Sequence, residues 1–258
     1  MKSFQDQLGN TIRIPFPPKR IISLVPSQTE LLFYLGLSEE IVGITKFCVH
    51  PAAQFSVKEK IGGTKKLHLD RIADLQPDLI IGNKEENEKS QIEALQQQFP
   101  VWMSDIKTMQ DTYEMIEGIG GLVNKSPQAA TLVQQLTAAW QNLEKVNHLT
   151  CLYLIWRKPY MAAGQATFIN EILTLSGFQN LLPTDSRYPA LSEEDLQQLN
   201  PQVLLLSSEP YPFKEKHLLE LQTILPNTKI RLVDGELFSW YGNRLLHTVD
   251  YMNSLVFV

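Results

Sequence analysis

The sequence predicts an α/β fold of two lobes, each built on a mainly parallel sheet, joined by one long helix. Short apolar runs rich in β-branched residues alternate with amphipathic segments, an order typical of parallel sheets covered by helices on both faces. One sequence pattern occurs twice, and an uninterrupted helical segment lies between its two copies. The chain of 258 residues is long enough for two lobes of about 100–150 residues each.

The first lobe is predicted to span residues 1–125 and to begin with an irregular, proline-rich lead-in. Residues 20–25 form an apolar, β-branched run that a proline ends, which predicts a buried strand. Ser27 and Glu30 have the spacing of a capping box, so a helix is expected from Ser27 to Gly36. The alternation continues with strands at 41–45, 78–81 and 100–103 and helices at 69–75, 86–97 and 108–119.

Residues 126–147 are predicted to form the connecting helix. Ser126 suits the N-cap and Pro127 the first helical position. At 1.5 Å per residue, about 20 helical residues give a rod of roughly 30 Å. The residues that make its apolar stripe are Leu132, Val133, Leu136, Trp140 and Leu143.

The second lobe, residues 148–258, repeats the strand–helix order. Its expected strands lie at 149–155, 203–206 and 229–233, and its expected helices at 167–176, 192–199 and 241–255.

The repeated pattern joins a short helix, a turn before proline and a buried strand. Its copies are LDRIADLQPDLII at 69–81 and EEDLQQLNPQVLL at 193–205. Their alignment pairs Asp70 with Glu194 and, farther on, Glu85 with Glu209. Any helix followed by such a turn and strand looks similar, so chance resemblance is the alternative to a true repeat.

Composition excludes several classes of protein. The net charge of −5 leaves no basic footprint for nucleic acid, and no apolar run approaches the roughly 20 residues of a membrane span. The N-terminus lacks the apolar stretch of a secretory signal. The protein as written is therefore expected in the cytoplasm, or in the periplasm if a leader has been removed, and as a monomer. Cys48 and Cys151 are too few for a disulfide framework, and Cys151 lies in an apolar run that predicts an inert core thiol.

Four segments, RIISLVPSQTELL, IVGIT, IGGT and LDRIADLQPDLII, resemble the cobalamin- and siderophore-binding periplasmic proteins of ABC importers. The resemblance covers residues 12–255 approximately. It implies two lobes around a helical backbone, a small ligand in the cleft between them, and ABC permease subunits as partners.

The resemblance also implies roles for individual residues. Asp70 and Glu194 match the two acidic residues that dock onto the transporter, although Asp70 is shorter than the usual glutamate. Phe47 matches an aromatic wall of the ligand site, and Thr64 stands where the family has a second aromatic residue. Tyr188 lies in the segment that matches a cleft loop of the second lobe.

Cys48 and His50 follow a predicted strand. Two residues apart in an extended segment, their side chains would face the same way. Thiolate and imidazole are good ligands for zinc, copper or iron, so a metal contact is one hypothesis. Lining an organic pocket and plain packing are the alternatives.

Glu85 and Glu209 follow equivalent buried strands, where ligands bind in open α/β sheets. They would serve as an acid/base pair or, as we favour, bind a cation or polar ligand. Aromatic rings and guanidinium groups that suit a flat or anionic ligand also follow strands. These candidates are Trp156, Arg157, Trp240, Tyr241 and Arg244.

No nucleophile elbow, zinc-protease, dinucleotide or phosphate-loop motif is present in the sequence. We therefore expect no enzyme but a substrate-binding protein of an ABC transporter, for a corrinoid, siderophore or other metal chelate. No cofactor is required on this hypothesis, because a metal or metal chelate would enter as the ligand. The alternative is a cytoplasmic metal-handling or small-molecule-sensing protein with the same fold, and a weaker one is an enzyme that uses Glu85, Glu209 and His50.

Overall fold

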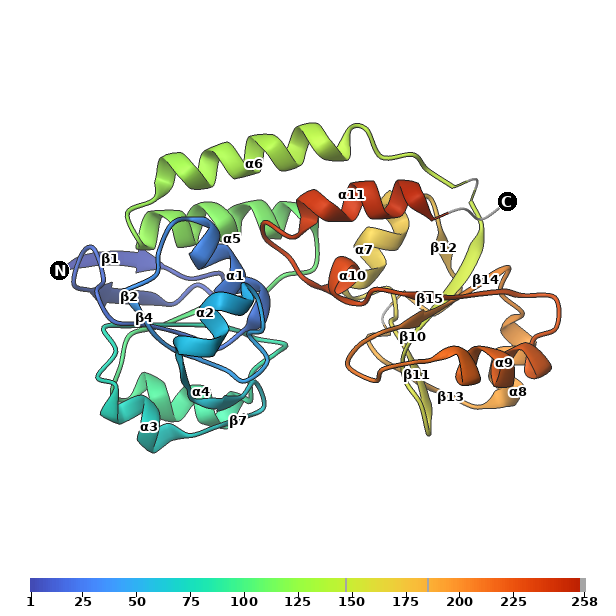
Figure 1. Cartoon of the computed structure of the whole chain (residues 1–258), viewed down its shortest axis with the longest axis horizontal. Coiled ribbons are helices and arrows are strands. Elements are labelled where there is room, and N and C mark those ends of the chain that lie inside the picture. Colours follow the sequence, from blue (N-terminus) through green and yellow to red (C-terminus); the bar gives the residue numbers. More distant parts are fainter. Residues whose placement is uncertain (147, 185, 256–258) are drawn as a thin grey trace. The chain divides into compact units, whose positions relative to one another are not determined.

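The computed structural model describes residues 1–146, 148–184 and 186–255 and has the expected α/β architecture (Figure 1). The chain divides into two compact units. Unit 1 comprises Met1–Ala138 and Tyr241–Leu245, and unit 2 comprises Ala139–Trp240 and Leu246–Val258. No helix among the described residues is long and apolar enough to cross a membrane.

The sheet of unit 1 has five parallel strands in the order β5-β4-β3-β8-β9. Its central strands are buried over their whole length, as expected of a sheet covered on both faces. The strands are β3 (Ile21–Ser23), β4 (Ile41–Ile44), β5 (Glu59–Lys60), β8 (Leu79–Asn83) and β9 (Val101–Ser104).

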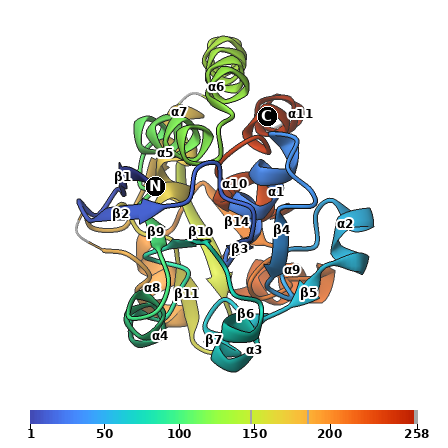
Figure 2. The same ribbon diagram turned by 90° about the vertical axis from the view of Figure 1, so that its left-hand side faces the viewer.

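Helices cover both faces of this sheet: in Figure 2, α1 and α5 lie on one side of the strands and α3 and α4 on the other. The helices are α1 (Pro26–Tyr34), α2 (Ala52–Val57), α3 (Leu69–Asp74), α4 (Lys89–Gln96) and α5 (Met109–Leu122). Thr108 and Asp111 form a reciprocal capping box at the start of α5. The capping box expected at Ser27 is wrong, because Val25 is the N-cap of α1 and no side chain caps that helix.

The irregular lead-in expected at the N-terminus is also wrong. β1 (Lys2–Gln5) and β2 (Thr11–Ile14) form an antiparallel hairpin. Its turn is anchored to β9, since the Gln7 amide donates to the carbonyl of Met103 at 3.1 Å. A second hairpin joins β6 (Gly62–Gly63) and β7 (Lys66–Leu67).

Unit 2 contains a six-stranded sheet in which β12, β10, β14 and β15 pair in parallel, and β11 pairs antiparallel with both β10 and β13. Its strands are β10 (Thr150–Trp156), β11 (Tyr160–Ala162), β12 (Gln179–Asn180), β13 (Ala190–Leu191), β14 (Val203–Ser207) and β15 (Lys229–Val233). Its helices are α7 (Phe168–Leu175), α8 (Glu193–Leu199), α9 (Glu215–Ile224) and α10 (Glu236–Ser239).

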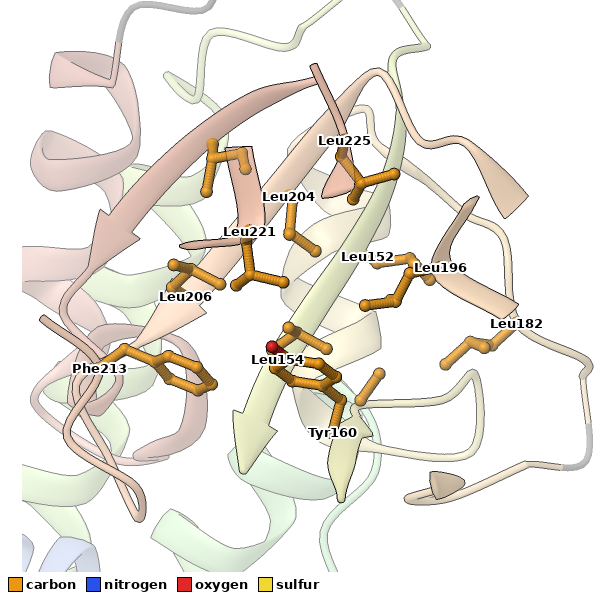
Figure 3. Close-up of a cluster of buried hydrophobic side chains, with 12 residues drawn as sticks. Leu152, Leu154, Tyr160, Leu182, Leu196, Leu204, Leu206, Phe213, Leu221 and Leu225 are labelled. Carbon is orange, nitrogen blue, oxygen red and sulfur yellow. The ribbon is translucent and has the colours of Figure 1, made fainter. Parts of the chain in front are cut away.

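The core of unit 2 is a cluster of leucines from β10, β14, α8 and α9, together with Phe213 and Tyr160 (Figure 3). On β10, Cys151 is buried as predicted, and burial raises the pKa of its thiol to about 12. Its thiol is therefore an inert packing group at neutral pH.

Three helices are markedly shorter than the sequence predicts: α4, which begins at Lys89 where residue 86 was expected, the connecting helix and the last helix. The connecting helix α6 spans Ser126–Trp140, whereas an end at residue 147 was expected, a position outside the described residues. After Trp140 a backbone amide forms a hydrogen bond outside the helix: the Glu144 amide donates to the Asn253 side-chain oxygen at 2.9 Å. The last helix, α11 (Leu245–Ser254), begins four residues later than expected because Gly242 adopts a φ of +104° that a helix cannot include.

The sequence repeat is a structural repeat. α3 and β8 correspond in position to α8 and β14, and β8 and β14 each pair in parallel with the first strand of their unit's parallel core, β3 or β10. The matched residues Ile72 and Leu196 are both fully buried under their sheets. Each copy therefore ends its strand at the carboxyl edge of the sheet, the edge on which a ligand would collect.

Candidate functional site

The carboxyl edge of the unit 1 sheet presents one exposed aromatic ring. Phe47 follows β4, and its side chain is 49% exposed. The Lys46 ammonium lies 5.0 Å from the centre of the ring. A Cβ at Gly63 would approach the ring to 3.0 Å, so the glycine lets the β6–β7 hairpin pack against Phe47 without displacing the ring. The ring is thus supported on one side and open to solvent.

Thr64 and Glu85 lie on the same edge, linked through two buried asparagines. The Asn87 side-chain amide donates to the carbonyl of Thr64 at 3.1 Å and its oxygen accepts from the Asn83 amide at 2.9 Å. The Asn83 side-chain oxygen in turn accepts from the backbone amide of Glu85 at 2.8 Å. These bonds hold the loop after β8 in a fixed conformation and bring two of the predicted ligand-binding positions together.

Cys48 and His50 do not form the pair that the sequence suggested. The segment is a turn and not an extended strand, since the Cys48 amide donates to the carbonyl of Thr45 at 3.1 Å. The Cys48 side chain is fully buried, whereas that of His50 is half-exposed. The expected common face is therefore wrong.

The thiol of Cys48 is held in a polar pocket of threonines. The Thr29 hydroxyl donates to its sulfur at 3.0 Å, and the Thr45 hydroxyl lies at 3.1 Å. Burial raises the pKa of the Cys48 thiol above its usual value, which disfavours the thiolate that a metal would need. Among the described residues, no group of three or more His, Cys, Asp or Glu side chains is arranged to hold a metal ion.

Tyr241 and Arg244 belong to unit 1, not to the second lobe where the sequence placed them. Tyr241 is buried, and burial raises the pKa of its hydroxyl well above the usual value, with the nearby carboxylate of Glu86 adding to the shift. Arg244 forms a bidentate pair with Glu30, its Nε and Nη2 each lying 2.8 Å from a carboxylate oxygen. The Arg244 guanidinium was expected to bind an anionic ligand, but in this structure it is paired with the carboxylate of Glu30.

In unit 2, Trp156 ends β10 with its side chain 41% exposed. The neighbouring Arg157 is engaged internally: its Nη2 lies 2.6 and 2.7 Å from the two carboxylate oxygens of Glu220. The hydrogen bond from Arg157 holds the pKa of Glu220 below its usual value. Of these two predicted residues, Trp156 is the one that offers an open surface.

Glu209 and Trp240, both predicted at strand ends, are in direct contact. One carboxylate oxygen of Glu209 accepts from the Trp240 indole at 2.9 Å and from the Ser239 hydroxyl at 3.0 Å. Burial raises the pKa of Glu209, and the two hydrogen bonds oppose this shift. Trp240 is only 7% exposed, so its indole serves mainly to orient this carboxylate.

Tyr188 lies half-buried in the loop before β13. Backbone bonds tie this loop to the chain after β11, because the Gly164 amide donates to the carbonyl of Arg187 at 2.6 Å. Its role at a ligand site remains a prediction.

Asp70 and Glu194 occupy the same place in the two structural repeats. Each is the second residue of its helix, α3 or α8, and each side chain is exposed. Both can therefore be reached by a protein partner, as their docking role requires, and the role itself remains a prediction.

Sequence reasoning missed an aromatic cluster in unit 2. Tyr211 lies 5.7 Å from Trp156 in an edge-on arrangement and 4.9 Å from Phe213, measured between ring centres. The Tyr211 hydroxyl lies 3.2 Å from His217 Nε2. The signal was the run YPF at 211–213, shortly after β14, but α9, which carries His217, was not predicted.

Comparison with known proteins places the chain among ligand-binding proteins. The profile of a family described as periplasmic binding protein matches residues 21–225. The chain is 28% identical over 197 residues to the vitamin B12-binding protein of Vibrio campbellii, covering 74% of this chain and 71% of that protein. It is 26% identical over 239 residues to the vitamin B12-binding protein of Pectobacterium carotovorum, covering 89% and 85%.

Solved structures show the same fold. The periplasmic vitamin B12 binding protein of Vibrio cholerae superposes with a TM-score of 0.75 and 22% identity, covering 92% of this chain and 96% of that one. The periplasmic heme-binding protein of Roseiflexus sp. RS-1 superposes with a TM-score of 0.79 and 20% identity, covering 91% and 97%. Likeness at this level of identity concerns the fold and leaves the ligand open.

Proposed function

Because the chain belongs to the periplasmic binding protein family, we propose that it binds a corrinoid, siderophore or other metal-chelate ligand and delivers it to an ABC transporter. The observation that carries this proposal is an exposed aromatic ring at the carboxyl edge of each sheet, Phe47 in unit 1 and Trp156 in unit 2. Aromatic faces bind flat organic ligands by stacking, and this edge is where open α/β sheets bind their ligands.

Two polar groups that follow strands of these sheets, Glu209 and Cys48, suit binding better than catalysis. The Glu209 carboxylate is fixed by two internal donors, and the Cys48 thiol is buried and protonated. Side chains held by internal hydrogen bonds are already ordered before a ligand binds, so less conformational entropy is lost on binding. We propose that the protein has no resident cofactor, since a metal would arrive as part of the ligand. We also propose that it functions in the periplasm.

A ligand panel tests the binding proposal. The wild-type protein, titrated with cyanocobalamin, hemin and a ferric siderophore, is expected to bind at least one with a Kd below about 10 μM. Phe47→Ala should weaken that binding about fivefold or more, because a stacking contact contributes about 1 kcal/mol. Intrinsic tryptophan fluorescence or calorimetry gives both values.

The matched control is Tyr34→Ala. Tyr34 is also an exposed aromatic residue of unit 1, at 45%, but it ends α1 and so lies away from the carboxyl edge. Its truncation should leave the Kd unchanged. Absence of saturable binding by all three compounds would contradict the proposed function, and an equal loss in the two variants would contradict the proposed place of binding.

The docking role of the two acidic residues has its own test. The double variant Asp70→Lys with Glu194→Lys is expected to abolish association with the cognate permease in a pull-down from detergent or nanodiscs, while ligand affinity stays within about twofold. Reversing complementary charges turns attraction into repulsion at the encounter. Asp74→Lys with Glu215→Lys, which reverses two other exposed acids on α3 and α9, should still associate. If the first variant binds the permease as the wild type does, the docking assignment fails.

A further inference from the structure

The hydrogen bonds around His217 determine which of its ring nitrogens carries the proton. The backbone amide of Lys214 donates to His217 Nδ1 at 3.0 Å, at the N-cap of α9. A backbone N–H can only donate, so Nδ1 must accept. In the neutral ring the hydrogen therefore lies on Nε2.

His217 is neutral at pH 7. Its side chain is 5% exposed, and burial lowers the pKa of the imidazole, with the cations of Arg157 and Lys216 acting in the same direction. Glu220 opposes the shift, but its carboxylate is already paired with Arg157.

The direction of the next hydrogen bond follows from this tautomer. With its hydrogen on Nε2, His217 donates to the hydroxyl oxygen of Tyr211 at 3.2 Å. A phenol has one proton, and here its oxygen accepts from His217, so the Tyr211 O–H is left to donate to a different acceptor. The hydroxyl of Tyr160 in the same unit differs, because it donates to Glu220 at 3.3 Å.

Tyr211 is held at the carboxyl edge of the sheet. It follows β14, and its backbone amide donates at 3.3 Å to the carbonyl of Ile155, next to Trp156 at the end of β10. Its ring meets Trp156 edge-on and packs on Phe213, which is buried. The ring that carries this hydroxyl thus lies against the exposed indole of Trp156.

We propose that Tyr211 is a ligand-binding residue that donates a hydrogen bond to an acceptor oxygen on the rim of a flat ligand stacked at Trp156, with His217 as its positioning residue. This inference rests on the proposed function and adds a selectivity: ligands with peripheral carboxylate or amide oxygens are preferred. Hemin carries peripheral carboxylates and cyanocobalamin carries peripheral amides, so the ligand panel shows which kind of acceptor oxygen is bound.

The test removes one oxygen atom. Tyr211→Phe keeps the aromatic packing and is expected to raise the Kd for the bound member of the panel about fivefold to tenfold, the value of one hydrogen bond. Tyr160→Phe makes the same change at the hydroxyl that faces Glu220 and should leave the Kd unchanged. An unchanged Kd in Tyr211→Phe would overturn the proposal, whereas failure of every panel member to bind would overturn the proposed function together with it.

A double-mutant cycle tests the positioning role. His217→Gln should weaken binding in the wild-type background but have no further effect in Tyr211→Phe, because the hydroxyl it orients is gone. A purely structural role would weaken both backgrounds equally. Imidazole ¹⁵N spectra at pH 7 should show the hydrogen on Nε2 of His217, and the opposite tautomer would contradict the assigned donor.

Discussion

Glu30→Ala is expected to lower the free energy of unfolding of unit 1 by about 3–5 kcal/mol. The two side chains of the Glu30–Arg244 pair are only 15% and 13% exposed. Removing the carboxylate leaves a guanidinium group with little water to solvate it, which costs far more than the net value of the pair. Hydrogen exchange of the β8 amides measures the loss, because these buried amides report the opening of unit 1.

Two comparisons isolate the cause. Glu59→Ala breaks the exposed pair with Arg71, whose side chains are 52% and 56% exposed, and should cost at most about 1 kcal/mol. Replacing both Glu30 and Arg244 by methionine leaves no unpaired charge and should recover most of the lost stability. A double variant as unstable as Glu30→Ala would show that the buried charge is not the cause.

Leu221→Ala is expected to destabilise unit 2 by about 2–5 kcal/mol. Leu221 is fully buried on α9, and Figure 3 shows it beside Leu204 and Leu206. Its truncation removes apolar contacts and leaves a cavity that the flanking strands can fill only in part. Denaturant unfolding, read by hydrogen exchange of the β14 amides, gives the magnitude.

The same helix provides the control. Leu219 lies two residues earlier on α9 and is 65% exposed, so Leu219→Ala should change stability by no more than about 0.5 kcal/mol. Both variants make the same chemical change in the same helix, which cancels differences in helix propensity. Equal effects of the two substitutions would contradict the packing of α9 against the core of unit 2.

Strand and helix positions that depend on local pattern could be predicted from the sequence. The repeat placed α3–β8 and α8–β14 correctly, since an amphipathic turn, a proline and a short apolar run specify a helix and a buried strand by themselves. Parallel pairing then follows from the alternation of elements. Glu209, predicted from the repeat, and Trp240, predicted from its place after the last strand, are joined in the structure by a hydrogen bond.

Contacts between distant segments were decided only by the tertiary structure. Glu30 has the spacing of a capping residue, but it pairs with Arg244, 214 residues away, because a charge that becomes buried must find its counter-charge wherever the fold brings one. Cys48 followed a strand as predicted, yet a turn buries it among threonines. The donor direction of Tyr211 depends on α9, an element the pattern did not reveal. The sequence by itself determined the alternation of strands and helices around each sheet and the sheet edges on which polar and aromatic residues collect. Burial and long-range pairing, which no local window contains, decided which of those residues remain open to a ligand.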